Sequence, residues 1–155
     1  MGMVKSIKRG QGWSRVEIMD STGVVGIFDE EETKLEPGRT YLILAGSNRI
    51  AEAIPIDELD KHKDSPMIRF LNFKTIPFAS DEYFVLSFKP RITKTGKRIA
   101  SLVVADSNRE MISSIVFPTS FAMAYTRIEE GGIYEMTFSK TKDGDIALKE
   151  VGNVN

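Results

Sequence analysis

The pattern of apolar and polar residues predicts short β-strands over most of the chain. Residues 13–20 alternate between polar and apolar side chains, a period that is typical of a strand with one buried face. Asp20-Ser21-Thr22-Gly23 is expected to form a turn at the end of this segment, and Pro37-Gly38 a second turn further along the chain. Further strands are expected at residues 4–9, 24–29, 41–45 and 49–55. Five short strands without helical periodicity indicate a small barrel or sandwich.

The second half repeats this pattern and adds a helix. Apolar residues recur at helical spacing over residues 121–129, which predicts a helix there. Thr119 or Ser120 is expected to cap its start, and Gly131-Gly132 is expected to end it. Strands are expected at residues 83–92, 97–106, 111–117, 133–140 and 145–151. The predicted order is three strands, the helix and two more strands.

Two further segments lie between the halves. Residues 57–64 are dense in charge and are expected to form a linker or a short exposed helix. Residues 67–78 contain Phe70, Phe73 and Phe78, so this segment is expected to pack between or across the two halves. The predicted organisation is a first domain, a linker and a second domain, over residues 1–56, 57–77 and 78–155.

Similar residues recur at similar places in the two halves, which indicates an internal repeat. The proposed matches are Asp20 with Asp106, Phe28 with Phe117, Gly38 with Gly131 and Tyr41 with Tyr134. The offset between matched residues grows along the chain, because the second half has a helix where the first has an acidic loop.

Composition narrows the classes of function. The chain has 155 residues, 41% hydrophobic and 28% charged, which is ordinary for a soluble globular protein of one domain or two small ones. Absence of cysteine excludes disulfides, and His62 as the single histidine argues against a metal site or a catalytic triad. No apolar run approaches about 18 residues, and the initial residues Met-Gly-Met-Val-Lys lack the apolar core expected of a secretory signal. A cytoplasmic protein is expected, with no cofactor, metal or membrane partner.

The formal net charge is −1, so binding to a polyanion must come from local patches. The densest patch has five basic residues within ten positions and no acid: Lys89, Arg91, Lys94, Lys97 and Arg98. Lys140 and Lys142 lie at a second predicted hairpin turn. Such turns bind phosphates or are simply solvated, and both readings stay open at this point.

Trp13 and Arg15 form a second candidate patch, because the alternation places both on the outward face of one strand. An indole beside a guanidinium suits stacking with a nucleic-acid base. The alternative is that Trp13 packs beneath the second domain or the segment 70–78. Gly26, in the next strand, is interpreted as a bulge or a close approach of the backbone.

One run of residues resembles a known family. It comprises Thr93–Ala100, then Leu102, Val104 and Asp106, then Ile115–Pro118 with Phe121. This run resembles the OB domain of bacterial C-family replicative DNA polymerases, the polymerase III α subunit. Five strands with a helix between the third and fourth is also the order of the OB fold. The expected fold class is therefore all-β with one short helix, as two tandem five-stranded OB-fold barrels.

The resemblance implies where a ligand binds. An OB fold binds single strands across strands 2 and 3, between the loops that join strands 1–2 and 4–5. Lys94 then lies in the first loop, with Lys97 and Arg98 at its exit, and Lys140 and Lys142 lie in the second loop. Ala100, Leu102 and Val104 are expected to point inward, so Ser101 and Val103 face the ligand.

Two departures from the family affect this site. Ser101 stands where the family often has an aromatic residue, and the turn after Asp106 has no glycine. Tyr83 and Phe88 are expected to supplement the face, while Phe117, Tyr134 and Phe138 are expected in the core. The second barrel should therefore hold a strand by charge more than by stacking.

The hypothesis that follows is a non-catalytic module of a bacterial or phage replicative polymerase that binds single-stranded DNA, with RNA left open. The alternative is a protein-interaction module that docks on replication partners. No constellation of residues indicates an enzyme, and no small-molecule substrate is expected.

Overall fold

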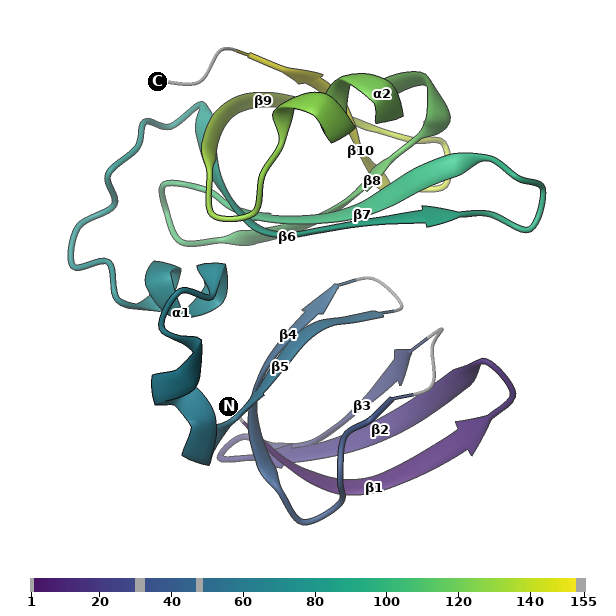
Figure 1. Ribbon diagram of the computed structural model, residues 1–155, viewed down its shortest axis with the longest axis vertical. Coiled ribbons are helices and arrows are strands. Elements are labelled where there is room, and N and C mark those ends of the chain that lie inside the picture. The colour runs from purple at the N-terminus through teal and green to yellow at the C-terminus, as the bar shows by residue number, and fades with distance from the viewer. Residues whose placement is uncertain (1, 30–32, 47–48, 153–155) are drawn as a thin grey trace. The chain divides into compact units, whose positions relative to one another are not determined.

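The computed structural model describes residues 2–29, 33–46 and 49–152. The chain divides into two compact units, Met1–Lys63 and Asp64–Asn155. Both are mostly β, as Figure 1 shows. The segment expected as a linker is shared between them, since residues 57–63 belong to the first unit and 64–77 to the second.

The first unit is an open antiparallel sheet. Its order is β3-β2-β1-β4-β5, and a short 3-10 helix η1 (Ile56–His62) follows the last strand. The strands are β1 (Gly2–Gly10), β2 (Trp13–Asp20), β3 (Gly23–Asp29), β4 (Thr40–Gly46) and β5 (Arg49–Pro55). One face packs around a cluster of buried residues that includes Val4, Val16, Ile18 and Tyr41.

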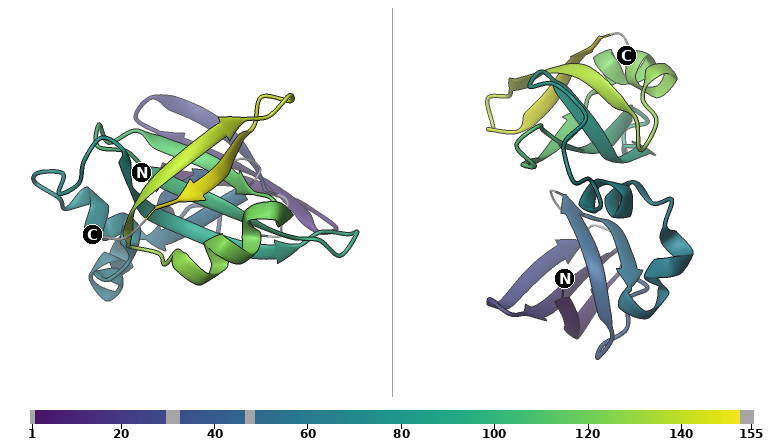
Figure 2. Two further views of the ribbon diagram at one scale, coloured as in Figure 1. Left: turned by 90° about the horizontal axis from the view of Figure 1, so that it is seen from above. Right: turned by 90° about the vertical axis from the view of Figure 1, so that its left-hand side faces the viewer.

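The second unit is a closed five-stranded barrel of order β10-β8-β7-β6-β9. Its strands are β6 (Glu82–Ile92), β7 (Arg98–Ala105), β8 (Met111–Val116), β9 (Ile133–Lys140) and β10 (Ile146–Val151). All pairs are antiparallel except β8 with β10, which pair in parallel at Ile115 and Ala147. Ala100, Leu102 and Val104 are buried in the interior cluster, which confirms their expected inward orientation. Figure 2 shows the barrel from two further sides.

Two helices accompany the barrel. Helix α2 (Pro118–Arg127) joins β8 to β9 and starts three residues earlier than expected. The expected cap by Thr119 or Ser120 is wrong: Phe117 holds the N-cap position without a side-chain hydrogen bond, because Pro118 takes the first helical position, where its missing N–H is not needed. Helix α1 (Pro66–Leu71), which the strand pattern did not predict, packs against β6.

The two units share one arrangement of hydrogen bonds, made by a glycine N–H and a tyrosine hydroxyl, which we call the tyrosine bracket. In the first, Gly38 donates its N–H to the Val4 carbonyl at 2.7 Å, and the Tyr41 hydroxyl accepts the Glu36 N–H at 3.0 Å. In the second, Gly131 donates to the Val85 carbonyl at 2.7 Å, and the Tyr134 hydroxyl accepts the Glu129 N–H at 2.9 Å. Gly38 and Gly131 have φ values of 83° and 85°, a left-handed conformation that suits glycine. The structure therefore confirms that Gly38 is equivalent to Gly131 and that Tyr41 is equivalent to Tyr134.

The strand registers correct one of the predicted matches. Asp20 and Asp106 each accept an N–H from the residue two positions on, so they are equivalent. Counting back from them makes Ser14 equivalent to Ala100. Their cross-strand partners are Asp29 and Val116. Phe28 therefore corresponds to Ile115, and its predicted match with Phe117 is wrong by two residues.

The units differ at the seam that closes the barrel. In the second unit the β8–β10 pair completes the ring. In the first unit the Asp29 carboxylate accepts the Ile50 N–H at 3.2 Å, and the Ser14 hydroxyl accepts the Thr33 N–H at 3.2 Å. Both side chains are buried. The closed barrel expected for the first half is thus replaced by an open sheet, whose edge meets its neighbour through side chains.

Candidate nucleic-acid interface

The turn between β6 and β7 is a compact hydrogen-bonded loop. Thr93 donates its N–H to the Lys97 carbonyl at 2.8 Å, and its own carbonyl and hydroxyl accept the N–H groups of Gly96 and Lys97 at 2.9 and 3.1 Å. Gly96 has φ 83°, as a three-residue hairpin loop requires. Lys94, Lys97 and Arg98 are exposed, and no acidic residue lies within the turn. The structure therefore presents three cations on a fixed backbone.

The turn between β9 and β10 has the same backbone. Thr141 donates to the Asp145 carbonyl at 2.8 Å and accepts from Gly144 and Asp145 at 3.0 and 3.1 Å. Its charges differ, because Asp143 and Asp145 offset Lys140 and Lys142. Counting only the lysines overstated how basic this turn is. In Figures 1 and 2 the two turns are separate projections of the barrel, so a strand would meet them at two places.

A third turn of the same kind joins β7 to β8 and has no glycine. Asp106 donates to the Glu110 carbonyl at 2.9 Å, and Arg109 takes the left-handed position with φ 65°. The Arg109 guanidinium donates to the Phe73 carbonyl at 2.6 Å and lies over the Phe70 ring at 5.9 Å. This arginine holds the α1 segment to the barrel.

The other predicted residues of the second unit are less available. Lys89 lies 3.4 Å from the Glu130 carboxylate, which also accepts the Phe88 N–H at 2.9 Å. Arg91 is half-buried and already interacts within the protein. Ser101 is half-buried opposite Lys89. The basic patch therefore reduces to the exposed turn.

Aromatic side chains do not supplement that face. Tyr83 and Phe88 pack against the interior of the barrel, contrary to expectation. Phe84 is fully buried beneath Phe70 and Phe73, whose ring centroids lie 5.7 and 5.3 Å from its own. Tyr134 and Phe138 belong to or pack on the core as expected, whereas Phe117 is 37% exposed and does not belong to it.

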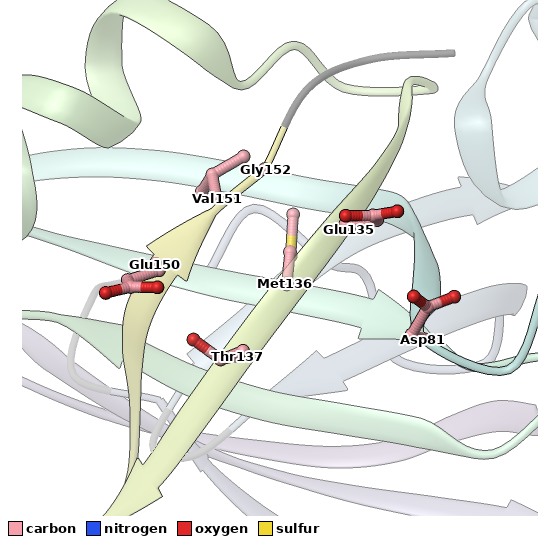
Figure 3. Close-up of a pocket in the computed structure, with 7 residues that line it drawn as sticks. All are labelled: Asp81, Glu135, Met136, Thr137, Glu150, Val151 and Gly152. Carbon is pink, nitrogen blue, oxygen red and sulfur yellow. The ribbon is translucent and has the colours of Figure 1, made fainter.

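A recess of about 180 Å³ on the barrel has the opposite electrostatic character. Figure 3 shows three carboxylates around it, those of Asp81, Glu135 and Glu150. Among the described residues that line it none is basic, so phosphate groups are repelled there. Within the described ranges no group of carboxylates and histidine has the geometry to hold a metal ion.

In the first unit, Trp13 and Arg15 lie on the outer face of β2, as predicted. The Trp13 ring is half-buried and stacks on Phe28, with centroids 5.9 Å apart and planes inclined by 20°. Phe28 is 49% exposed, and Arg15 is also exposed. Sequence reasoning missed Phe28; the signal was its position opposite Arg15 in the predicted β2–β3 hairpin. The nearby Arg9 donates instead to the carbonyls of residues 33 and 35.

Comparison with protein-family models finds no matching family, and comparison with curated proteins finds no significant relative. No helix in the described part of the chain is long and apolar enough to cross a membrane. The function must therefore be argued from the geometry.

Proposed function

We propose that this protein binds single-stranded nucleic acid, with DNA as the expected ligand, and performs no chemistry on it. One observation carries the proposal: the β6–β7 turn holds Lys94, Lys97 and Arg98 exposed on a hydrogen-bonded backbone, without an acid among them. Cations on a preformed loop neutralise phosphates at little cost in conformational entropy. The proposal extends to RNA, since backbone contacts do not read the sugar or the base.

The architecture of the second unit supports an OB fold as part of this proposal. The strand order, the parallel β8–β10 pair and the helix between the third and fourth strands are those of a five-stranded Greek-key barrel. In that fold the β6–β7 turn borders the ligand site. We propose that the first unit is a related barrel that is left open at the β3 edge. Membership of a bacterial or phage replicative polymerase is proposed on the resemblance of residues 93–121 alone.

A second candidate function is docking on another protein, and β3 favours it. Val24 and Val25 of this edge strand are 51% and 53% exposed, and residues 23–28 carry no charge. An uncharged, apolar edge strand is a surface to which another strand can pair. Because β3 belongs to the first unit, docking on a protein does not conflict with nucleic-acid binding by the second unit. Docking becomes the favoured function only if the β6–β7 turn does not bind nucleic acid.

The test is a titration of fluorescein-labelled oligothymidylate, followed by anisotropy at several salt concentrations. Binding should weaken steeply with salt. The double variant K94E/K97E should weaken binding and reduce the slope of log K against log salt by about 1.4, which is about 0.7 for each lost phosphate contact on a single strand.

The matched control is K140E/K142E, which changes the same number of charges on a turn of the same backbone. Its effect should be much smaller, because Asp143 and Asp145 already offset those lysines. Absence of binding to the wild-type protein at low salt would refute the proposed function. Equal effects of the two double variants would show that overall charge, rather than the β6–β7 turn, governs affinity.

A further inference from the structure

On the outer face of the first unit's sheet, two glycines allow planar side chains to pack directly against the backbone. Gly10 lies opposite Trp13 in the β1–β2 ladder. A Cβ atom added at Gly10 would lie only 2.0 Å from the indole Cε2 and 2.2 Å from Nε1. The indole therefore rests directly on the backbone of β1, where any side chain would displace it.

Gly26 serves Arg15 in the same way. A Cβ atom at Gly26 would lie 3.0 Å from the guanidinium Nη2 and 3.3 Å from Nε. The guanidinium thus lies against the backbone of β3, and the expected close approach at Gly26 is made by this side chain. Phe28, directly opposite Arg15 in the ladder, stacks on the indole at 5.9 Å. An indole, a phenyl ring and a guanidinium are therefore held together on one face of the sheet.

The charge around these groups favours an anionic ligand. Lys8 is exposed and lies opposite Arg15 in the β1–β2 ladder. Among the described residues of this face, the acid Glu17 accepts a hydrogen bond from the Ser6 hydroxyl at 3.1 Å. In this described part of the face, two cations thus stand against one carboxylate that already has a hydrogen-bond partner; the acidic residues 30–32 lie outside the described residues.

We propose that Trp13, Phe28 and Arg15 form a stacking site for the bases of single-stranded nucleic acid. The inference rests on the proposed function and deepens it: the second unit contacts phosphates through its basic turn, and the first unit contacts bases. Removing an aromatic side chain that stacks on one base weakens binding by about 5- to 150-fold. Lys8 supplies a contact to the phosphate of a stacked nucleotide. Gly10 and Gly26 act as positioning residues that fix the planes of the indole and the guanidinium.

Trp13 is the only tryptophan in the sequence, so its fluorescence reports on this site alone. The experiment titrates unlabelled oligothymidylate against Trp13 emission and, in parallel, labelled oligothymidylate by anisotropy. A stacked base should quench the emission, with a midpoint that agrees with the anisotropy. F28A should weaken affinity about tenfold, which is the lower half of the range for one stacked base.

G10A provides a second variant that removes no aromatic ring. Its methyl group displaces the indole, so affinity should fall in the same direction as in F28A. The control is Y125A, which removes a 62% exposed ring from α2 of the second unit and should leave affinity unchanged. Circular dichroism checks that each variant is folded, and F28A alone decides the matter if G10A does not fold.

The outcomes separate the two proposals. Binding by anisotropy without a change in Trp13 emission overturns the stacking site and leaves the proposed function standing. An equal loss of affinity in Y125A and F28A also overturns it, since the effect then does not belong to this face. If neither signal changes at low salt, the proposed function fails and the stacking site fails with it.

Discussion

The two units have the same strand order and the same tyrosine bracket, yet only one closes. At equivalent positions of the second and third strands, the second unit has Ala100 and Val116, which are apolar and buried, and the first has Ser14 and Asp29. A carboxylate beside a strand edge accepts the N–H that a neighbouring carbonyl would otherwise accept, as Asp29 does with Ile50. We infer that barrel closure in this protein depends on whether these positions are apolar, and less on strand order.

Exchanging the residues at these positions should give the largest effect. V116D places a carboxylate among the apolar residues of the second unit's core and should lower the free energy of unfolding by about 3–5 kcal/mol. Hydrogen exchange of amides in β8 and β10 measures this for the second unit separately from the first.

The reverse change, D29V, should cost less, about 1–3 kcal/mol, because it leaves the half-buried Ile50 N–H without its carboxylate acceptor. A cost below about 1 kcal/mol for V116D would contradict the role given to apolar residues at these positions. A stabilising D29V would show instead that the first unit closes readily once the carboxylate is removed.

The tyrosine brackets should respond alike in the two units. Y41F and Y134F each remove a hydroxyl that accepts a backbone N–H, at 3.0 and 2.9 Å, and each should lower the free energy of unfolding of its own unit by about 1–2 kcal/mol. Urea denaturation with unit-specific hydrogen exchange measures both. Y125F, whose side chain is exposed on α2, should have no effect. Costs that differ by more than about 1 kcal/mol would mean that the brackets are not equivalent.

The smallest net change is expected for R109G. A non-glycine residue in the left-handed region costs on the order of 1 kcal/mol, which glycine relieves. The substitution also removes the hydrogen bond to the Phe73 carbonyl and the contact with the Phe70 ring, so the two effects nearly cancel. Overall stability should stay within about 0.5 kcal/mol while amides of residues 66–73 exchange faster.

The converse variant, G144R, tests the cost of a non-glycine residue at the left-handed position of the β9–β10 turn. A Cβ atom added at Gly144 would meet nothing within 4 Å, so the backbone cost dominates and the second unit should lose about 1 kcal/mol. Unchanged exchange at residues 66–73 in R109G would show that Arg109 does not hold the α1 segment.

The strands and turns were predictable because alternation and turn residues act locally. Closure was not, because the hydrogen bonds of the buried Ser14 and Asp29 side chains form only once the strands are packed in the folded sheet. The start of α2 was misplaced since Pro118 overrides the hydroxyl residues that follow it. The match of Phe28 with Phe117 failed because residue type was compared without counting the strand register.

The candidate site was predicted in part. The exposed cations of the β6–β7 turn were predictable directly from the sequence. The burial of Phe84 beneath Phe70 was not, because it depends on where α1 packs. Asp143 and Asp145 stand beside Lys140 and Lys142 in the sequence, so the lower net charge of that turn was predictable. The contributions of Phe28 and Gly10 could not be predicted, because they depend on how β2 pairs with β3 and with β1. No single segment of the sequence specifies that pairing.

The three hairpin loops that share one backbone carry different side chains, and this has a practical consequence. Loop residues 94–97, 107–110 and 142–145 should be exchangeable as cassettes, because the hydrogen bonds that shape each loop involve the residue just before it, Thr93, Asp106 or Thr141. Charge on the barrel surface can therefore change by substitution without a change of fold. Under the proposed function, such exchanges should raise or lower the affinity for polyanions in a few mutational steps.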